Sequence, residues 1–204
     1  MLPHRFVYLA SQSPRRSQLL NQLGVEHRLL LPDRSENIEW LEEVRSNELP
    51  ADYVRRVTLV KLQAACARLA RRRLPEAPIL CADTTVAVGR RILGKPGDEG
   101  EAAAMLRLLS GRAHRVLTAV AVSAGRETFL EMSVSRVRMA DLSEHTIRRY
   151  IESGEPDGKA GAYAIQGRIA AWIDSIEGSY TGIMGLPLFE TTRLLSRARV
   201  RLDL

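Results

Sequence analysis

Apolar and polar positions alternate along this chain in blocks that predict strands and helices in turn. Residues 6–10 form a short apolar run, as in a buried strand. Leucines at helical spacing follow, and Ser13, Pro14 and Gly24 supply a cap, a first helical position and a stop. The pattern therefore predicts a strand that leads directly into a helix near the start of the chain.

The same alternation continues to the other end of the chain. Two capping signals, Asp98 with Glu101 and Ser143, predict helices that end near residues 110 and 154. Helices are also predicted over residues 51–73 and 187–198, strands over residues 79–88, 114–122, 129–139 and 169–176, and loops over residues 32–49 and 154–167.

This order of elements indicates an α/β protein. We expect a single domain over residues 1–204, in which two lobes share a mixed, twisted sheet and enclose a central cleft. The hydrophobic content of 45% is ordinary for a chain with a proper core, and no apolar run approaches the roughly 20 residues of a membrane span. No secretory signal is visible in the first residues, so we predict a cytoplasmic protein without a membrane partner.

The charge of the chain points away from nucleic acid. Its formal net charge is +6, but the 30 Lys and Arg residues are scattered among 24 acidic ones, and aromatic residues make up only 5%. The one dense cluster, Arg71 to Arg73, suits a solvated helix end. Only three of the basic residues are lysines, which suggests sites that need a compact ammonium rather than a guanidinium.

Lys61 is one of these lysines, and it falls on the apolar stripe of its predicted helix. Val54, Val57 and Ala65 stand three or four residues apart on the same stripe. A lysine that extends along the stripe edge to reach water is one interpretation. The other is an ammonium directed into an anion-binding cleft.

Asp83 interrupts the apolar strand of residues 79–88. A buried carboxylate without a partner is costly, so such groups are usually paired, metal-bound or neutralised. A structural hydrogen bond and a role in general-base or metal chemistry are both open to it.

Residues 11–16 place hydroxyls and two guanidiniums where a strand meets a helix N-terminus, which suits a polyphosphate. Residues 154–160 are not a P-loop, because three residues separate the glycines and Ala160 stands where a P-loop needs Ser or Thr. His114 has no second ligand at zinc spacing, so we assign it a structural or substrate-edge role. Cys66 and Cys81, the only cysteines, exclude a disulfide framework and are expected to be buried and inert.

Six segments in register resemble the Maf family of nucleotide pyrophosphatases, from Tyr8 to about Leu195. They are the Leu-Ala-Ser-Gln-Ser-Pro-Arg-Arg run from residue 9, Ala-Asp-Thr from residue 82, Gly-Lys-Pro from residue 94, Leu-Ser-Gly-Arg-x-His from residue 109, Lys-Ala-Gly-Ala-Tyr-Ala-Ile-Gln-Gly from residue 159, and Gly-Ser-Tyr with the following Gly-Leu-Pro-Leu from residues 178 and 185. All three lysines match family lysines.

The resemblance implies a fold similar to that of inosine triphosphate pyrophosphatase and a metal-dependent cleavage between the α- and β-phosphates. Asp83 matches the family's proton acceptor and, with Glu36, the binding site of a divalent cation, Mg²⁺ or Mn²⁺. Lys61 and Lys95 would act in catalysis. The nucleoside triphosphate substrate would be bound by Ser13, Arg15, Arg16, Thr84, Lys159 and Gln166.

Three of these positions resemble the family branch that acts on dTTP and UTP. Arg15, Thr84 and Gln166 agree with that branch, whereas the branch that prefers 7-methyl-GTP has Trp, Gln and Glu at the same places. A Gln amide both donates and accepts, as the edge of a uracil or thymine ring requires. We therefore expect hydrolysis of dTTP, UTP or modified pyrimidine analogues, which would keep such nucleotides from polymerases.

Two positions depart from the family pattern. Ser35 and Gly158 replace acidic residues, which bears on metal affinity and on the loop that carries Lys159. The family is often dimeric, so the resemblance also implies a homodimer. Alternative functions are a purine-directed triphosphatase and a nucleotide-sensing or nucleic-acid-binding regulator of cell division, for which the net charge of +6 is the argument.

Overall fold

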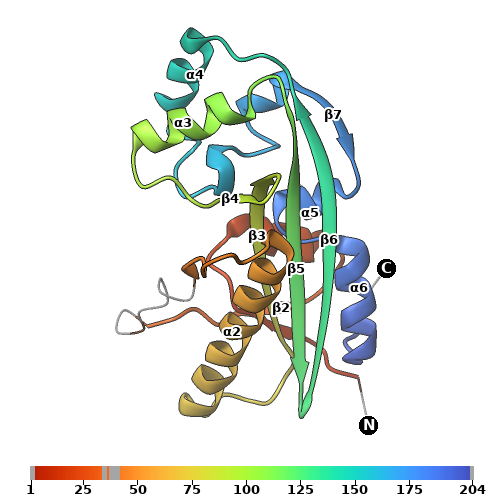
Figure 1. Ribbon diagram of the computed structural model, residues 1–204. Helices are drawn as coiled ribbons and strands as arrows, with labels where there is room; N and C mark the ends of the chain where they lie inside the picture. The colour runs from red at the N-terminus through yellow and green to blue at the C-terminus, as the bar shows by residue number, and fades with distance from the viewer. Residues whose placement is uncertain (1–2, 34–35, 37–41, 203–204) are drawn as a thin grey trace.

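The computed structural model describes residues 3–33, 36 and 42–202, and its centre is a mixed sheet of seven strands (Figure 1). The strands lie in the order β2, β1, β3, β5, β6, β7, and β4 pairs with the far end of β3. Pairing is parallel among β2, β1 and β3 and antiparallel elsewhere. Their bounds are β1 Val7–Leu9, β2 His27–Leu29, β3 Ile79–Val88, β4 Arg91–Leu93, β5 Ala113–Ala124, β6 Glu127–Met139 and β7 Ile173–Glu177.

Six helices occur in the described part of the chain. They are α1 Pro14–Gln22, α2 Pro50–Arg71, α3 Glu99–Leu109, α4 Glu144–Ile151, α5 Tyr180–Met184 and α6 Leu188–Arg197. The predicted α/β class with a shared mixed sheet is confirmed. The division into two lobes within one domain stays a prediction.

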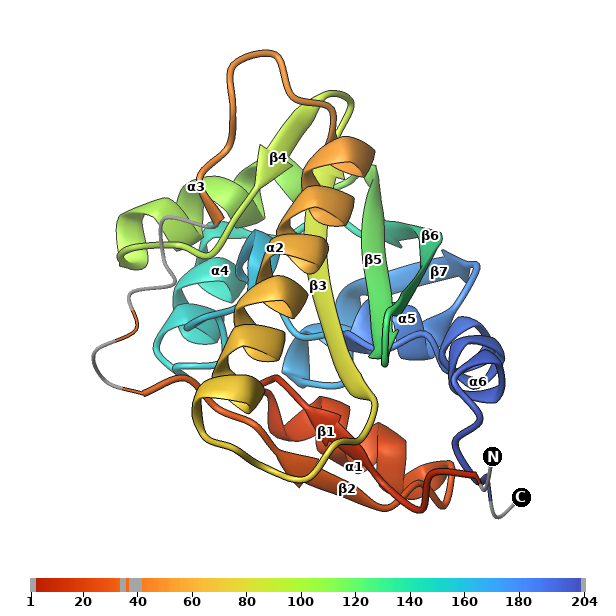
Figure 2. The ribbon, with the colours of Figure 1, turned by 90° about the horizontal axis from the view of Figure 1, so that it is seen from below.

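The long β5–β6 hairpin separates two layers of helices, with α2 on one side and α6 on the other (Figures 1 and 2). Leu117 and Ala119 of β5 pack with Val57 of α2. Val120, which faces the opposite side because strand side chains alternate, packs with Leu194 of α6. Both faces of β5 are therefore buried, as its near-continuous apolar run requires.

The predicted boundary signals act as expected at two helices. The Asp98 side chain accepts a hydrogen bond from the Glu101 backbone N–H, while the Glu101 carboxylate accepts one from Gly97. Ser143 accepts from the Thr146 N–H at the start of α4. Ser13 caps α1 in an extended conformation but its side chain makes no capping hydrogen bond. The Ser13 hydroxyl is thus not used by its own helix.

The strand predicted over residues 169–176 is wrong in its first half. Residues Arg168–Trp172 form a 3-10 helix, and β7 begins only at Ile173. Ile169 is fully buried as the first apolar residue of that turn, packed with the core under α3 and α4. Its apolar character therefore reflects packing of a helical turn rather than of a strand.

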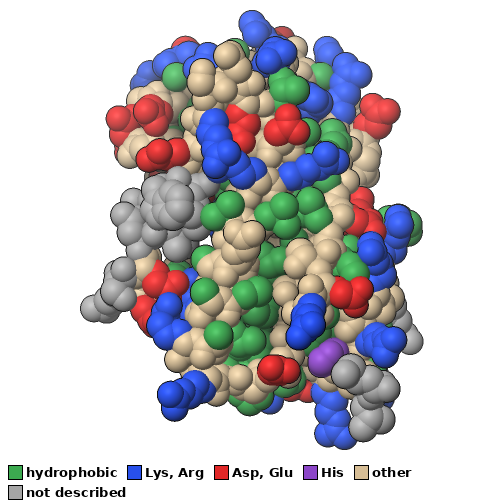
Figure 3. All heavy atoms as spheres, turned by 60° about the horizontal axis from the view of Figure 1, so that its bottom comes forward, with side chains coloured by type: hydrophobic (Ala, Val, Ile, Leu, Met, Phe, Trp, Pro, Cys, Tyr) green, Lys and Arg blue, Asp and Glu red, His purple; other side chains and the backbone are tan. Residues whose placement is uncertain are grey.

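The surface shows no concentrated basic region on the face in Figure 3, where Lys, Arg, Asp and Glu side chains are interspersed. None of the helices in the described ranges is long and apolar enough to cross a membrane. Of the two cysteines, Cys81 is buried and Cys66 is half-buried.

Candidate active site

An open edge of β3 forms the floor of a cavity of about 520 Å³. β1 pairs with β3 only as far as Leu80, and β4 begins to pair at Val86. Between these points no described strand lies beside β3 on that edge, and the side chains of Asp83 and Thr84 border the space. The walls come from the N-terminus of α1, from α2, from the segment after β4, from residues 158–165 and from α5. Elements far apart in the sequence therefore meet at one strand edge.

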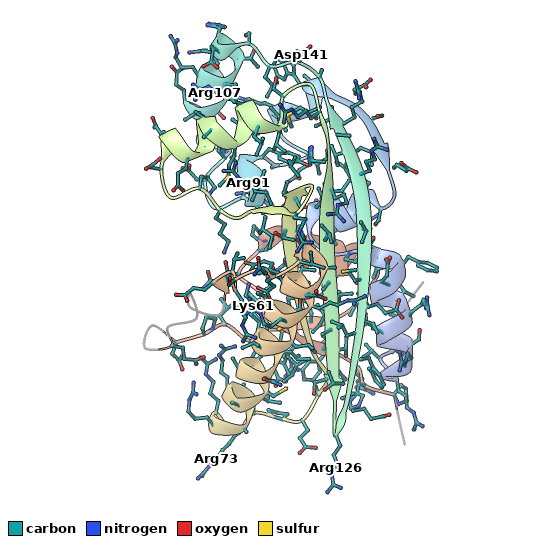
Figure 4. The ribbon with its side chains drawn as sticks, in the orientation of Figure 1. Lys61, Arg73, Arg91, Arg107, Arg126 and Asp141 are labelled. Carbon is teal, nitrogen blue, oxygen red and sulfur yellow. The ribbon has the colours of Figure 1, made fainter. Side chains whose placement is uncertain are left out.

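Four charged side chains form a continuous chain of ion pairs in this cavity. The Lys61 ammonium donates to Asp83 Oδ1 at 2.5 Å and to Glu42 Oε1 at 2.7 Å. Glu42 also accepts from Lys95, at 2.8 Å through Oε2. Asp83 is only 8% exposed, so the partner that a buried carboxylate requires is Lys61. Lys61 lies at the centre of the molecule, where α2 approaches β3 and β4 (Figure 4).

The ion pairs shift the pKa values of both Lys61 and Glu42. Burial alone would lower the pKa of the Lys61 ammonium, but the nearby Asp83 and Glu42 carboxylates more than offset it, and the pKa is raised. Burial alone would raise the pKa of Glu42, whereas Lys61 and Lys95 bring it below its usual value. These groups therefore keep their charges at neutral pH. The sequence left two interpretations of Lys61, a side chain that reaches water at the stripe edge and an ammonium directed into a cleft. In the structure the ammonium is directed into the cavity.

The turn between β1 and α1 brings cations to a second wall. Arg16 donates to the Gly185 carbonyl at 2.7 Å and to Ser11 Oγ at 3.0 Å, and Arg15 approaches the Met184 carbonyl at 3.4 Å. Burial lowers the pKa of both guanidiniums, although an arginine stays protonated throughout. Ser13 borders the same space.

Lys159 reaches the cavity from the glycine-rich connection. Its ammonium donates to the Asp157 carbonyl, and its pKa is lowered by burial and by the nearby Arg15. A backbone hydrogen bond fixes the segment that follows Lys159, because the Gly161 N–H donates to the Gly94 carbonyl at 3.0 Å. This bond ties the loop of Lys159 to the segment of Lys95.

His114 is buried behind the same wall and holds Tyr163, one of the cavity residues. Its Nε2 lies 2.7 Å from the Tyr163 hydroxyl, and burial lowers the pKa of His114 to about 4. This geometry agrees with the structural or substrate-edge role expected of it.

Glu36 lies outside the cavity in this structure. Its carboxylate pairs with Arg68 at 2.7 Å and with Arg71, and hydrogen bonds from Arg68 are the main reason that its pKa falls to about 2. The arginines at the end of α2 were expected to be solvated. Arg71 and Arg72 instead form ion pairs with Asp33 as well. Ser35, the other departure in this loop, lies outside the described residues.

Gln166 is exposed and does not border the cavity, although its neighbour Ile165 does. The remaining expected residues, which are Asp83, Lys61, Lys95, Ser13, Arg15, Arg16, Thr84 and Lys159, all border it. Among the residues that the structure describes, no three His, Cys, Asp or Glu side chains gather as a metal site.

Two features of the site were not singled out by sequence reasoning. Glu42 lies in the polar loop of residues 32–49, and nothing in the sequence distinguishes it from the four other glutamates of that loop. Ile183 and Met184 of α5 add apolar walls, and they lie between the two parts of the last family segment rather than in either part.

Comparison with known proteins shows the family to which this chain belongs. A family model described as Maf-like protein matches residues 6–198. The chain belongs to the Maf family. Among curated relatives, the dTTP/UTP pyrophosphatase of Albidiferax ferrireducens is 60% identical over 190 residues, which are 93% of this chain and 95% of the relative. The dTTP/UTP pyrophosphatase of Cupriavidus pinatubonensis is 57% identical over 198 residues, 97% of this chain and 99% of the relative.

A third relative extends the comparison. The dTTP/UTP pyrophosphatase of Ralstonia nicotianae is 58% identical over 201 residues, covering 98% of this chain and 97% of its own length. The Maf resemblance read from six sequence segments is thus confirmed over nearly the whole chain.

Proposed function

We propose that this Maf protein hydrolyses nucleoside triphosphates, chiefly dTTP and UTP, to the nucleoside monophosphate and pyrophosphate. One observation carries the proposal: a buried carboxylate, Asp83, is held by Lys61 in a cavity that Lys95 and Lys159 also enter. The names of the relatives, dTTP/UTP pyrophosphatase, support the same reaction.

The cations suit a triphosphate. Lys61, Lys95, Lys159, Arg15 and Arg16 border one space whose only carboxylates among the described residues are Asp83 and Glu42, and the N-terminus of α1, where the helix dipole favours an anion, borders it too. In phosphoryl transfer the protein contributes mainly position and charge stabilisation, because the charge is spread over the phosphate oxygens. We assign these five side chains, together with Ser13, to the phosphates.

Asp83 is the proton acceptor of the proposed reaction. A water oxygen bonds to the α-phosphorus while its proton passes to the Asp83 carboxylate, and the bond from that phosphorus to the α–β bridging oxygen breaks. The electron pair of this bond leaves with pyrophosphate. Lys61 holds Asp83 through Oδ1, so we assign the proton to Oδ2.

The carboxylates of Asp83 and Glu42 fit a divalent cation, Mg²⁺ or Mn²⁺. Both bind the same ammonium, so they converge on one point of the cavity, and Mg²⁺ is usually held by one or two carboxylates together with substrate phosphates. When bound, the cation would neutralise charge on the leaving pyrophosphate. Glu36 could join this site only after exchanging its ion pairs with Arg68 and Arg71.

Base selection is assigned to Thr84, Gln166 and Arg15, and Arg15 therefore has a second role besides its contact with the phosphates. Thr84 and Arg15 border the cavity beside the apolar side chains of Ile183 and Met184, which suit a planar base. Gln166 lies outside this lining, so its amide would have to turn inward with the segment that carries Ile165. A homodimer and a cytoplasmic location stay predictions that accompany this function.

The test is pyrophosphate release from dTTP, UTP, CTP, ATP, GTP, ITP and 7-methyl-GTP, with Mg²⁺ or Mn²⁺ and with EDTA. Cation-dependent release that favours dTTP and UTP, with no orthophosphate formed, is the expected result. Release that favours a purine would overturn the base assignment. Absence of release with every nucleotide, together with salt-sensitive DNA binding, would favour the regulator of cell division instead.

A further inference from the structure

We propose that Thr118 is a specificity-determining positioning residue. It fixes the hydroxyl proton of Thr84 so that Thr84 presents a hydrogen-bond acceptor to the base, and this selects uracil or thymine over cytosine. The inference rests on the proposed function and adds to it a residue outside the cavity, since Thr118 is buried, 1% exposed, behind Thr84 on the neighbouring strand.

The direction of the hydrogen bonds follows from counting protons. Thr118 Oγ1 lies 2.7 Å from the Gly182 carbonyl and 2.9 Å from Thr84 Oγ1. A carbonyl only accepts, so the single Thr118 proton is committed to Gly182. Thr84 must therefore donate its own proton to Thr118. The bond between the two threonines, which either could donate in isolation, has one direction in this fold.

Thr84 is consequently an acceptor toward everything else. The only other polar group within hydrogen-bond reach among the described residues is Arg16 Nη2, at 3.5 Å, and a guanidinium only donates. The outward-facing lone pair of Thr84 Oγ1 can thus meet an N–H or O–H of a ligand. It cannot bind a phosphate oxygen, which is itself an acceptor.

The position of Thr84 indicates the base rather than the phosphates. Thr84 and Asp83 are consecutive in β3, so their side chains lie on opposite faces of the sheet. Asp83 faces the lysines, whereas Thr84 shares its face with Val86, whose cross-strand neighbour is Val116. Both valines border the cavity, as do Ile183 and Met184 of α5. An apolar chamber with one acceptor matches a nucleobase.

The chemistry of the pyrimidines makes this acceptor selective. Uracil and thymine carry an N–H at ring position 3, whereas cytosine has an unprotonated nitrogen there that only accepts. With ring position 3 against Thr84, uracil and thymine form a hydrogen bond, whereas cytosine in the same orientation leaves two acceptors facing each other. Removal of the Thr118 hydroxyl would free the Thr84 proton to rotate outward and donate to cytosine, so the discrimination would be lost.

The experiment measures binding of the α,β-methylene analogues of UTP and CTP, which cannot be cleaved to pyrophosphate, by titration calorimetry. The wild type is expected to bind the UTP analogue about tenfold or more tightly than the CTP analogue, because a buried polar group left unpaired is costly. Thr118→Val should bring the two dissociation constants to within about threefold of each other. Thr118→Ser, which keeps the hydroxyl, should retain the wild-type ratio.

Thr85→Val is the matched control. Thr85 is a neighbour in β3 whose buried hydroxyl has no hydrogen-bond partner among the described residues, so the same substitution should leave the ratio unchanged. Should Thr118→Val fail to fold, Thr118→Ala removes the same hydroxyl with a smaller side chain. Circular dichroism of each variant establishes folding first.

Two results would overturn the inference. One is a wild type that binds both analogues equally, and the other is a Thr118→Val protein in which both affinities fall by the same factor, as a purely structural residue would give. Pyrophosphate release from UTP by the wild type is measured alongside. Its absence would contradict the proposed function, while the ratio of binding constants still judges the role of Thr118.

Discussion

The Lys61 ammonium is shared between two carboxylates, and only one of them, Asp83, belongs to a regular element. Glu42 reaches Lys61 and Lys95 from the segment before α2, and together with Asp83 these four groups balance one another's charge. A substrate triphosphate would compete for the same lysines and release the Glu42 carboxylate. We infer that Glu42 then becomes available to the divalent cation.

Glu42→Gln tests this exchange. With one carboxylate fewer, the Mg²⁺ concentration for half-maximal pyrophosphate release is expected to rise about tenfold or more. Glu43→Gln is the control, because the neighbouring Glu43 is exposed. If Glu36→Gln raises the Mg²⁺ requirement and Glu42→Gln does not, the cation is held by Glu36 instead.

His114 makes the stability of the fold depend on pH. Burial lowers its pKa to about 4 in the folded protein, against about 6.5 in an unfolded chain. The folded state therefore keeps His114 neutral where the unfolded state binds a proton. This contribution is fully present above about pH 6.5 and is lost as the pH falls toward 4.

The free energy of unfolding, measured with urea between pH 7 and pH 4, should fall by up to about 1.4 kcal/mol per pH unit more steeply in wild type than in His114→Gln. His145→Gln, at an exposed position of α4, should retain the wild-type slope. Equal slopes for wild type and His114→Gln would mean that the buried imidazole is not the source.

At the scale of elements, the loop of Lys159 depends on a close approach of its backbone to β3. Gly161 has φ +68°, and a Cβ there would lie 2.9 Å from the Val86 side chain. Val86 is a β-branched residue in the middle of the sheet and cannot move aside by rotation alone. The short approach is what allows the Gly161 N–H to bond Gly94.

Gly161→Ala is therefore expected to lower the free energy of unfolding by about 2 to 4 kcal/mol, from the left-handed backbone and the clash together. Gly125→Ala separates the two causes. It has φ +62° but nothing within 4 Å of the added Cβ, so it should cost only about 1 to 2 kcal/mol. Urea unfolding of both variants makes the comparison, and equal losses would remove the clash from the explanation.

The long elements could be predicted from the sequence, whereas β2, β4 and α5 could not. β3 coincides with the predicted residues 79–88, and eight of its ten side chains are buried. β2 and β4 have three residues each and α5 has five, too few for a period to be visible. They owe their conformation to neighbours, as when Arg91–Leu93 pairs with the end of β3. Of these short elements, β4 bounds the open edge of β3 and α5 supplies a wall of the cavity.

At the scale of the whole molecule, the site joins segments that the chain order keeps apart. Lys61 and Asp83 could be recognised individually, because each is a charge in an apolar pattern. Their contact, at 2.5 Å, depends on how α2 packs across β3. The position of Thr118 behind Thr84 depends on the register between β3 and β5, which cannot be predicted from the local sequence pattern of either strand.

At the scale of the whole molecule, several of the positive side chains border the cavity, and the face in Figure 3 has no concentrated basic region. Arg73 at the end of α2 and Arg126 at the tip of the β5–β6 hairpin point outward at one end of the molecule, away from Lys61 (Figure 4). Such separated charges contribute little to binding beyond a Debye length of about 8 Å at physiological salt. The lysines that enter the cavity are the ones that meet the substrate in the proposed reaction.

The most direct measurement of the central claim is the rate of pyrophosphate release from UTP with Mg²⁺ for wild type, Asp83→Asn and Asp174→Asn. Asp174 is an exposed residue of β7 that pairs with Arg138 and does not border the cavity. Loss of the proton acceptor should lower kcat at least about 100-fold in Asp83→Asn, while Asp174→Asn stays at the wild-type rate. An Asp83→Asn protein that folds and keeps a rate within a few-fold of wild type would contradict the assignment of Asp83 and, with it, the proposed mechanism.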